Sequence, residues 1–155
     1  MPEVAEGQPA PALDLPTDGG GRVSLAALKG KPVVVYFYPK ADTPGCTNEG
    51  KDFSALIDDF AALDATVIAV SKDSVKKLDR FKAKHDLKVV LASDADGAAC
   101  DAWGVWVQKK LYGREYMGIE RATFLVGADG NIVHAWRNVR VAGHAEAVLE
   151  ALKGP

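Results

Sequence analysis

The sequence contains little cysteine: Cys46 and Cys100 are its only two among 155 residues. Its first residues have neither the basic end nor the apolar stretch of a secretion signal. Two cysteines in a chain without a secretion signal do not indicate a framework of structural disulfides, so we expect them to be reactive or simply buried. The longest apolar run, Val33 to Tyr38, is far too short to span a bilayer. We therefore expect a cytoplasmic protein with no membrane partner.

Strong net charge is also missing. The 19 Lys and Arg residues nearly balance the 21 Asp and Glu residues, and the formal net charge is −2. This balance gives no reason to expect nucleic acid or an anionic membrane as a partner. The most basic local cluster, Lys109, Lys110 and Arg114, is small, and we interpret it as a solvated loop. The histidines are scattered, and no Cys/His spacing suits zinc, so no metal site is expected.

No repeat, low-complexity tract or linker divides the chain, so residues 1–155 are predicted to form a single domain. The order strand, helix, strand, helix, strand, hairpin, helix predicts an α/β fold with a mixed central sheet and helices on both faces. A thioredoxin-like fold has this order. The predicted strands are 13–15, 23–25, 33–38, 65–70, 89–92, 123–126 and 132–136. The predicted helices are 43–63, one carrying Val75, Leu78 and Phe81 with Ser71 or Asp73 as its cap, a short one over 98–103, and a closing one over 145–152.

Cys46 follows the junction between a predicted buried strand and a helix. Pro39 ends the strand, because proline cannot donate to a central ladder. Thr43 is a good N-cap, and Pro44 suits the first helical position. Cys46 then falls at about the third helical position, where free N–H groups and the helix dipole favour the nucleophilic thiolate. The alternative is a buried, inert cysteine; the first-turn position after Pro-Gly favours the reactive interpretation.

Pro39, Thr43 and Cys46 also fall in the pattern Pro-x-x-x-Thr-x-x-Cys. With the segments 104–106, 112–113, 118–121 and 123–125, this pattern resembles the peroxiredoxins, and within them the bacterioferritin comigratory protein or peroxiredoxin Q group. The resemblance covers nearly the whole chain. It implies a thioredoxin-like enzyme, a thiol peroxidase, that reduces hydrogen peroxide and small alkyl hydroperoxides without a metal or organic cofactor.

The resemblance assigns roles to single residues. Cys46 would attack the O–O bond and become a sulfenic acid, and Arg121 would stabilise the thiolate and the charge that builds on the peroxide oxygens. Thr43 would offer its hydroxyl to the thiolate or the peroxide, which is compatible with capping the helix. Pro39 would shield the pocket from water. Glu49 would either pair with Arg121 or its neighbours, or be a solvated residue of the helix face.

The chain departs from the family where a resolving cysteine is expected. The two familiar positions are occupied by Lys51, five residues after Cys46, and by Lys82. The intramolecular recycling route common in the family is therefore in question. Cys100, with Trp103 three residues on, is interpreted as a packed core residue, and as the resolving cysteine only in the alternative. The working hypothesis is a one-cysteine enzyme that is reduced by an external thiol such as a thioredoxin, a glutaredoxin or glutathione.

Two other functions compete with this hypothesis. A disulfide oxidoreductase needs two cysteines separated by two residues, and Cys46-Thr47-Asn48-Glu49 does not provide them. A peroxide sensor that passes its oxidation to a partner protein remains open, because the resolving cysteine is missing. The resemblance predicts a monomer, with a weak dimer as the alternative.

Two further groupings have structural interpretations. The segment Asp94–Gly97 resembles the beginning of a calcium loop, but its twelfth position is Val105, where a bidentate acid is required. We expect a turn and a helix cap there. Core packing is expected to explain most of four aromatic residues that could otherwise line the pocket mouth: Trp103, Trp106, Tyr112 and Tyr116.

Overall fold

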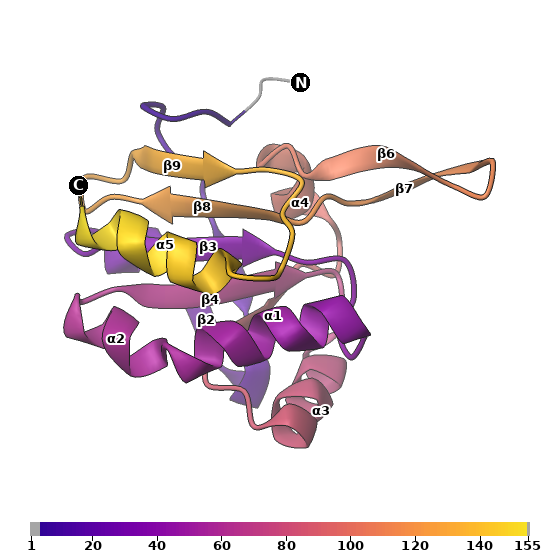
Figure 1. Cartoon of the computed structure of the whole chain (residues 1–155), viewed down its shortest axis with the longest axis horizontal. Helices are drawn as coiled ribbons and strands as arrows, with labels where there is room; N and C mark the ends of the chain where they lie inside the picture. The colour runs from indigo at the N-terminus through magenta and orange to yellow at the C-terminus, as the bar shows by residue number, and fades with distance from the viewer. Residues whose placement is uncertain (1–3, 155) are drawn as a thin grey trace.

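A five-stranded mixed sheet forms the centre of the protein. The computed structural model describes residues 4–154, and its main sheet has the strand order β5-β4-β3-β8-β9 (Figure 1). Three strands run parallel: β3 (Val33–Phe37), β4 (Thr66–Ser71) and β5 (Val90–Ser93). Two run antiparallel to them: β8 (Ala122–Val126) and β9 (Ile132–Trp136). The predicted mixed sheet is confirmed.

Helices cover both faces of this sheet, as predicted. One face packs against α1 (Pro44–Ala55), α2 (Ile57–Ala62), α3 (Val75–His85) and α5 (His144–Lys153). The other face packs against α4 (Ala98–Ala102) and the small antiparallel pair of β1 (Asp14–Pro16) and β2 (Arg22–Ser24). Two short 3-10 turns, η1 (Asp18–Gly20) and η2 (Ala26–Leu28), flank β2. Among residues 4–154, no helix combines the length and the apolar content that crossing a membrane requires.

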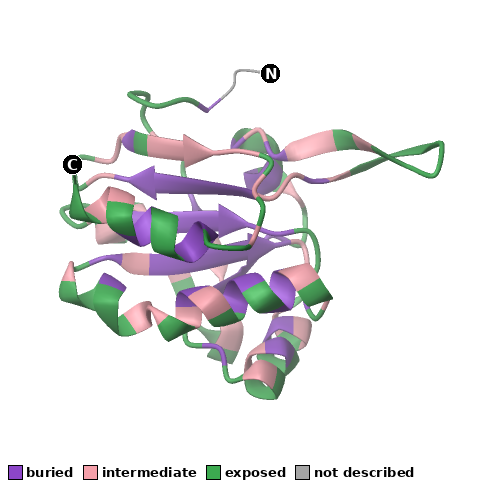
Figure 2. Ribbon diagram, in the orientation of Figure 1, coloured by how far each residue is buried: buried purple, intermediate pink, exposed green. Residues whose placement is uncertain are grey.

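The strand that leads to Cys46 is buried on both faces. All five residues of β3 are buried, which Figure 2 shows as a continuous purple strand. Val34 and Tyr36 belong to the core cluster under α1, and Val35 belongs to the cluster under α4. Because neither face meets water, the strand reads as an unbroken apolar run instead of an alternating one.

Two helix predictions are wrong in detail. The helix predicted over 43–63 breaks at Leu56, whose N–H bonds to the carbonyl of Phe53 in a tighter turn, and α2 then starts at Ile57. Phe60 reaches the core in this way and is fully buried. The cap of α3 is Ser74, whose hydroxyl accepts the N–H of Lys77 at 3.2 Å; it is neither Ser71 nor Asp73.

The expected solvated loop around Lys109 is in fact a β-hairpin. Strands β6 (Trp106–Leu111) and β7 (Arg114–Ile119) pair antiparallel and project away from the main sheet (Figure 1). Tyr112 and Gly113 have φ values of 52° and 79°, which suits a two-residue hairpin turn. Tyr112 and Tyr116 are 96% and 46% exposed, so the prediction that core packing explains them is wrong. Trp103 is fully buried as expected, and Trp106 is partly buried against the core cluster under α4. The sequences of β6 and β7 do not alternate between apolar and polar residues, because both faces of the hairpin meet water over much of their length.

Candidate active site

Cys46 occupies the predicted third position of α1, after Pro44 and Gly45. Its side chain is only 2% exposed and belongs to the core cluster that contains Tyr36 and Phe53. Thr43 takes the N-cap position with an extended backbone, but its hydroxyl makes no capping bond. The first turn of α1 therefore places the sulfur at the edge of the core, near the positive end of the helix.

Arg121 directly precedes β8, and its side chain extends to the sulfur of Cys46. Its Nη2 donates to Cys46 Sγ at 3.4 Å, and its Nη1 donates to Glu49 Oε1 at 2.6 Å. A Cβ on Gly45 would lie 3.1 Å from Arg121 Nη2, so the absence of a side chain there lets the guanidinium approach. Burial disfavours the charge of Arg121, but Glu49 and Cys46 outweigh it and raise its pKa. The guanidinium therefore stays charged beside the sulfur.

Glu49 is the buried partner of this guanidinium. It is 1% exposed, so of its two expected environments the structure shows the ion pair and excludes the solvated one. Burial raises the pKa of Glu49 to about 7, although Arg121 opposes the shift. No side chain or backbone group within residues 4–154 forms a hydrogen bond to its Oε2. Glu49 can therefore gain a proton near neutral pH, which would weaken its hold on Arg121.

Aromatic rings and a neutral histidine surround the ion pair. The ring of Tyr36 stacks on Phe53 with a centroid separation of 4.5 Å. His144 Nε2 lies 2.7 Å from the hydroxyl oxygen of Thr123, and burial, helped by the charge of Arg121, lowers the pKa of this histidine to about 4. His144 is therefore uncharged at neutral pH. These groups shield Glu49, which is 1% exposed, and a surrounding of low dielectric strengthens its interaction with Arg121.

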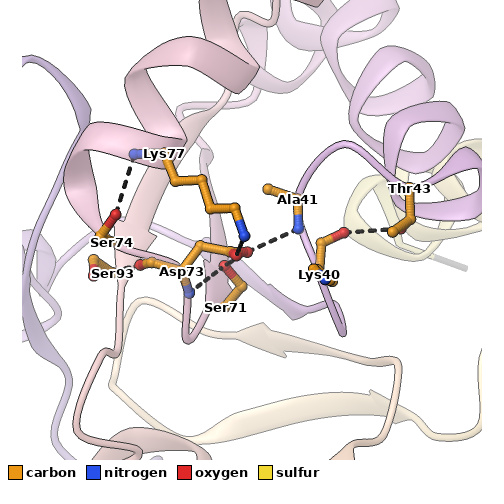
Figure 3. Close-up of polar contacts among 8 residues, drawn as sticks. All are labelled: Lys40, Ala41, Thr43, Ser71, Asp73, Ser74, Lys77 and Ser93. Carbon is orange, nitrogen blue, oxygen red and sulfur yellow. Dashed lines mark hydrogen bonds and ion pairs between the residues drawn. The ribbon is translucent and has the colours of Figure 1, made fainter.

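The loop that leads into α1 is tied to the ends of two parallel strands by Asp73 (Figure 3). Its Oδ2 accepts the N–H of Ala41 and the hydroxyl of Ser71, both at 2.8 Å. The hydroxyl of Ser93 donates to the Asp73 carbonyl at 2.6 Å. The Thr43 hydroxyl donates to the Lys40 carbonyl at 2.8 Å and so closes the loop on itself. These bonds fix the backbone from which Cys46 is presented.

Sequence reasoning missed this role of Asp73 and considered the residue only as a cap. The available signal was positional, because polar residues follow directly on two neighbouring parallel strands, whose carboxyl ends share one edge of the sheet. A second anchor was missed as well. The carboxylate of Asp42 bonds to Lys84 and His85, each at 2.8 Å, and these bonds hold the same loop against α3.

A cavity of about 440 Å³ opens beside Arg121. Pro39, Val107, Lys109 and Val139 are among its lining residues. Pro39 is exposed and forms part of the wall, at the end of β3 as predicted. The structure thus brings Pro39, Arg121, Glu49 and Cys46 to one place, and it directs the Thr43 hydroxyl to the Lys40 carbonyl.

Cys100 lies elsewhere. It is fully buried on α4, in the core cluster on the opposite face of the sheet from Cys46. The segment 94–97 forms the expected turn and helix start, with Gly97 at the N-cap position of α4. The carboxylate of Asp94 accepts the N–H groups of Ala99 and Cys100 at 3.0 and 2.7 Å. Burial and this carboxylate raise the pKa of the Cys100 thiol. Both cysteines are free, and the central sheet separates their clusters.

The fold and this constellation define the class of thioredoxin-fold peroxidases, and comparison with known proteins confirms it. The model of the AhpC/TSA family matches residues 6–135. Peroxiredoxin Bcp of Xanthomonas campestris is 50% identical over 147 residues, covering 94% of this chain and 92% of that protein. Peroxiredoxin Bcp of Bacillus subtilis is 48% identical over 147 residues, covering 95% of this chain and 94% of its own length.

Solved structures give the same result. A mutant of Xylella fastidiosa PrxQ superposes with a TM-score of 0.93 at 40% identity, covering 99% of this chain and 98% of that one. A mutant of Xanthomonas campestris peroxiredoxin Q superposes with a TM-score of 0.90 at 47% identity, covering 98% of both chains. The chain belongs to the AhpC/TSA family, and within that family it is a peroxiredoxin of the bacterioferritin comigratory protein, or peroxiredoxin Q, group. The resemblance and the thioredoxin-like fold are thereby confirmed.

Proposed function

We propose that this peroxiredoxin reduces hydrogen peroxide and small alkyl hydroperoxides through Cys46, and that an external thiol recycles it. The observation that carries the proposal is the donation of Arg121 Nη2 to Cys46 Sγ at 3.4 Å, with Glu49 holding the other end of the guanidinium at 2.6 Å. A fixed cation beside a sulfur at a helix N-terminus favours the thiolate, which is the attacking form. The same cation stabilises negative charge on the peroxide oxygens.

The first step transfers one oxygen atom to the sulfur. The Cys46 thiolate attacks one peroxide oxygen, an S–O bond forms and the O–O bond breaks. The second oxygen leaves with the bonding electron pair and takes up a proton as water or alcohol, and Cys46 becomes a sulfenic acid. Pro39 forms a wall of the cavity from which the peroxide enters. The Thr43 hydroxyl would have to release the Lys40 carbonyl before it donates to the thiolate or the peroxide. We therefore assign it the closing of the loop first and the donation to the reacting atoms second.

An external thiol would complete the cycle. The sulfenic acid condenses with the thiol, releases water and leaves a mixed disulfide, and a second thiol displaces Cys46 as a free thiol. Three features support this route over an internal one. The two positions where a resolving cysteine is expected hold lysines: Lys51 is exposed, and the amine of Lys82 forms an ion pair with Asp18 at 2.9 Å. The remaining cysteine, Cys100, lies across the sheet from Cys46. We expect a monomer in the cytoplasm, where reducing thiols are abundant.

Peroxide consumption in the presence of dithiothreitol tests both parts of the proposal. The Cys46→Ser variant should consume no peroxide, and the Cys100→Ala variant should turn over at the rate of the unaltered protein. Peroxide consumption by Cys46→Ser would contradict the assignment of the nucleophile. Loss of turnover in Cys100→Ala, with the first oxidation intact, would establish recycling through Cys100 instead.

A peroxide sensor is the second candidate, and the burial of Cys46 favours it. At 2% exposure the sulfur is poorly accessible to thiols that do not dock at the site, so its sulfenic acid would persist until one dedicated partner binds there and reacts with it. Slow turnover with dithiothreitol, glutathione and thioredoxin alike would support the sensor over the peroxidase.

A further inference from the structure

The β6–β7 hairpin carries most of the large hydrophobic side chains that are exposed in the described part of the chain. Among the residues that the structure describes, the exposed large hydrophobic side chains are Leu111, Tyr112, Tyr116, Met117 and Val133. All except Val133 belong to the hairpin, and Figure 2 shows its distal half in green. A two-stranded ribbon gains little stability of its own, and contiguous exposed apolar side chains mark interaction sites.

The strand register divides the hairpin into two faces with different surroundings. Three pairs form the face that we call the site face: Val107 with Gly118, Lys109 with Tyr116, and Leu111 with Arg114. Three pairs form the rear face: Trp106 with Ile119, Gln108 with Met117, and Lys110 with Glu115. On the rear, the amine of Lys72 lies 4.1 Å from the ring centroid of Trp106, beside α4.

The site face continues the cavity beside Arg121, whose Nη2 donates to Cys46 Sγ. Val107 and Lys109 line that cavity together with Arg121. Beyond them the same face carries Tyr116 and Leu111, which are 46% and 54% exposed. The site face therefore starts at the cavity beside Arg121 and extends outward to the hairpin tip.

The two faces also differ in charge. The site face carries Lys109 and Arg114 and no carboxylate, whereas Lys110 and Glu115 balance each other on the rear face. The carboxylate of Glu120 lies at the cavity edge, after the end of β7, and so belongs to neither face. It accepts hydrogen bonds from the Asn138 N–H and from Arg137. A cationic face with exposed apolar residues complements an acidic surface that carries an apolar patch.

We propose that the site face is the docking surface for the protein thiol that reduces the Cys46 sulfenic acid. The partner would carry its thiol within an acidic surface that has exposed apolar residues. A small thiol such as glutathione would be accommodated within the cavity and would leave Leu111 and Arg114, at the hairpin tip, without a contact. The proposal rests on the proposed function, since it names the reductant of that same site.

Matched substitutions on the two faces test the proposal. Arg114→Glu reverses a charge on the site face, and Lys110→Glu makes the same change on the rear face of the same exposed ribbon. The probe is a thioredoxin of net negative charge, and we measure kcat/KM for its oxidation at low ionic strength. We expect Arg114→Glu to lower kcat/KM about tenfold and Lys110→Glu to change it by less than about twofold. Added salt should reduce the difference, because it screens exposed charges.

A second pair tests the apolar part of the site face. Leu111→Ser should lower the same kcat/KM several-fold, and Met117→Ser on the rear face should leave it unchanged. Dithiothreitol turnover and the rate of the first oxidation by hydrogen peroxide should be equal in all four variants. Equal effects of Arg114→Glu and Lys110→Glu would overturn the proposal, as would failure of thioredoxin to reduce the unaltered protein while dithiothreitol succeeds. Absence of sulfenic acid in the unaltered protein would instead refute the proposed function.

Discussion

Replacing Glu49 by Gln should change how the stability of the protein depends on pH. Burial raises the pKa of Glu49 from 4.5 to about 7. Between these values the folded protein binds more protons than the unfolded chain, so the contribution of Glu49 to the free energy of unfolding falls as pH rises. At about 1.4 kcal/mol for each pKa unit, the loss amounts to about 3 kcal/mol across this window.

His144 acts in the opposite direction. Burial and Arg121 lower its pKa from 6.5 to about 4, so the unfolded chain binds the extra proton and stability rises with pH between those values. The two contributions are of similar size and nearly cancel between about pH 4.5 and 6.5. Gln keeps an amide oxygen that can accept from Arg121 Nη1, so the substitution removes the titration with little change of shape.

Urea unfolding at half-unit steps from pH 4.5 to 8, under reducing conditions, measures the effect. The difference between Glu49→Gln and the unaltered protein cancels the contribution of every other titrating group. The free energy of unfolding of Glu49→Gln, relative to the unaltered protein, should rise by about 3 kcal/mol as pH increases from 4.5 to 7, because the loss caused by Glu49 is absent. A pH-independent difference would refute the reasoning, since it would mean that Glu49 does not take up a proton in this range.

Substitutions at three further positions test the geometry of the site. Arg121→Lys removes the fork that spans Cys46 and Glu49, and the rate of oxidation by hydrogen peroxide in stopped flow should fall about a hundredfold; a fall of less than about threefold would contradict the role given to Arg121. Gly45→Ala should lower the same rate, because a Cβ would lie 3.1 Å from Arg121 Nη2, while an unchanged rate would show that the guanidinium can shift freely. Asp73→Ala removes the acceptor for the Ala41 N–H and should cost about 1–3 kcal/mol in urea unfolding as well as lowering kcat. Recovery of kcat in Asp73→Asn is then expected, and its absence would speak against an acceptor role.

The sequence sufficed for the parts of the molecule whose signals are local. Strand β3 is buried on both faces, and its unbroken apolar run indicated this directly. Thr43 and Pro44 located the start of α1, so the position of Cys46 within the first turn was predictable. The order of strands and helices then limited the fold to one familiar arrangement, which the sheet topology and the solved relatives confirm.

The sequence did not suffice where tertiary contacts decide the structure. The hairpin was missed because both of its faces meet solvent, so its strands lack apolar alternation. The break at Leu56 was missed because Phe53 and Phe60 keep helical spacing across it while the backbone turns to bury both. Asp73 acts on Ala41, which lies 32 residues away in the sequence. Its position after a parallel strand was the available signal, and no local pattern identifies its partner.

The most direct test of the account is the product of a single turnover. One equivalent of hydrogen peroxide is added to the fully reduced protein, and intact mass and free thiols are measured together. The account predicts a gain of one oxygen atom with one thiol remaining, that of the buried Cys100. Loss of two hydrogen atoms with no free thiol, in a monomer, would contradict it by showing an internal disulfide between Cys46 and Cys100. An unchanged mass would contradict the peroxidase function itself.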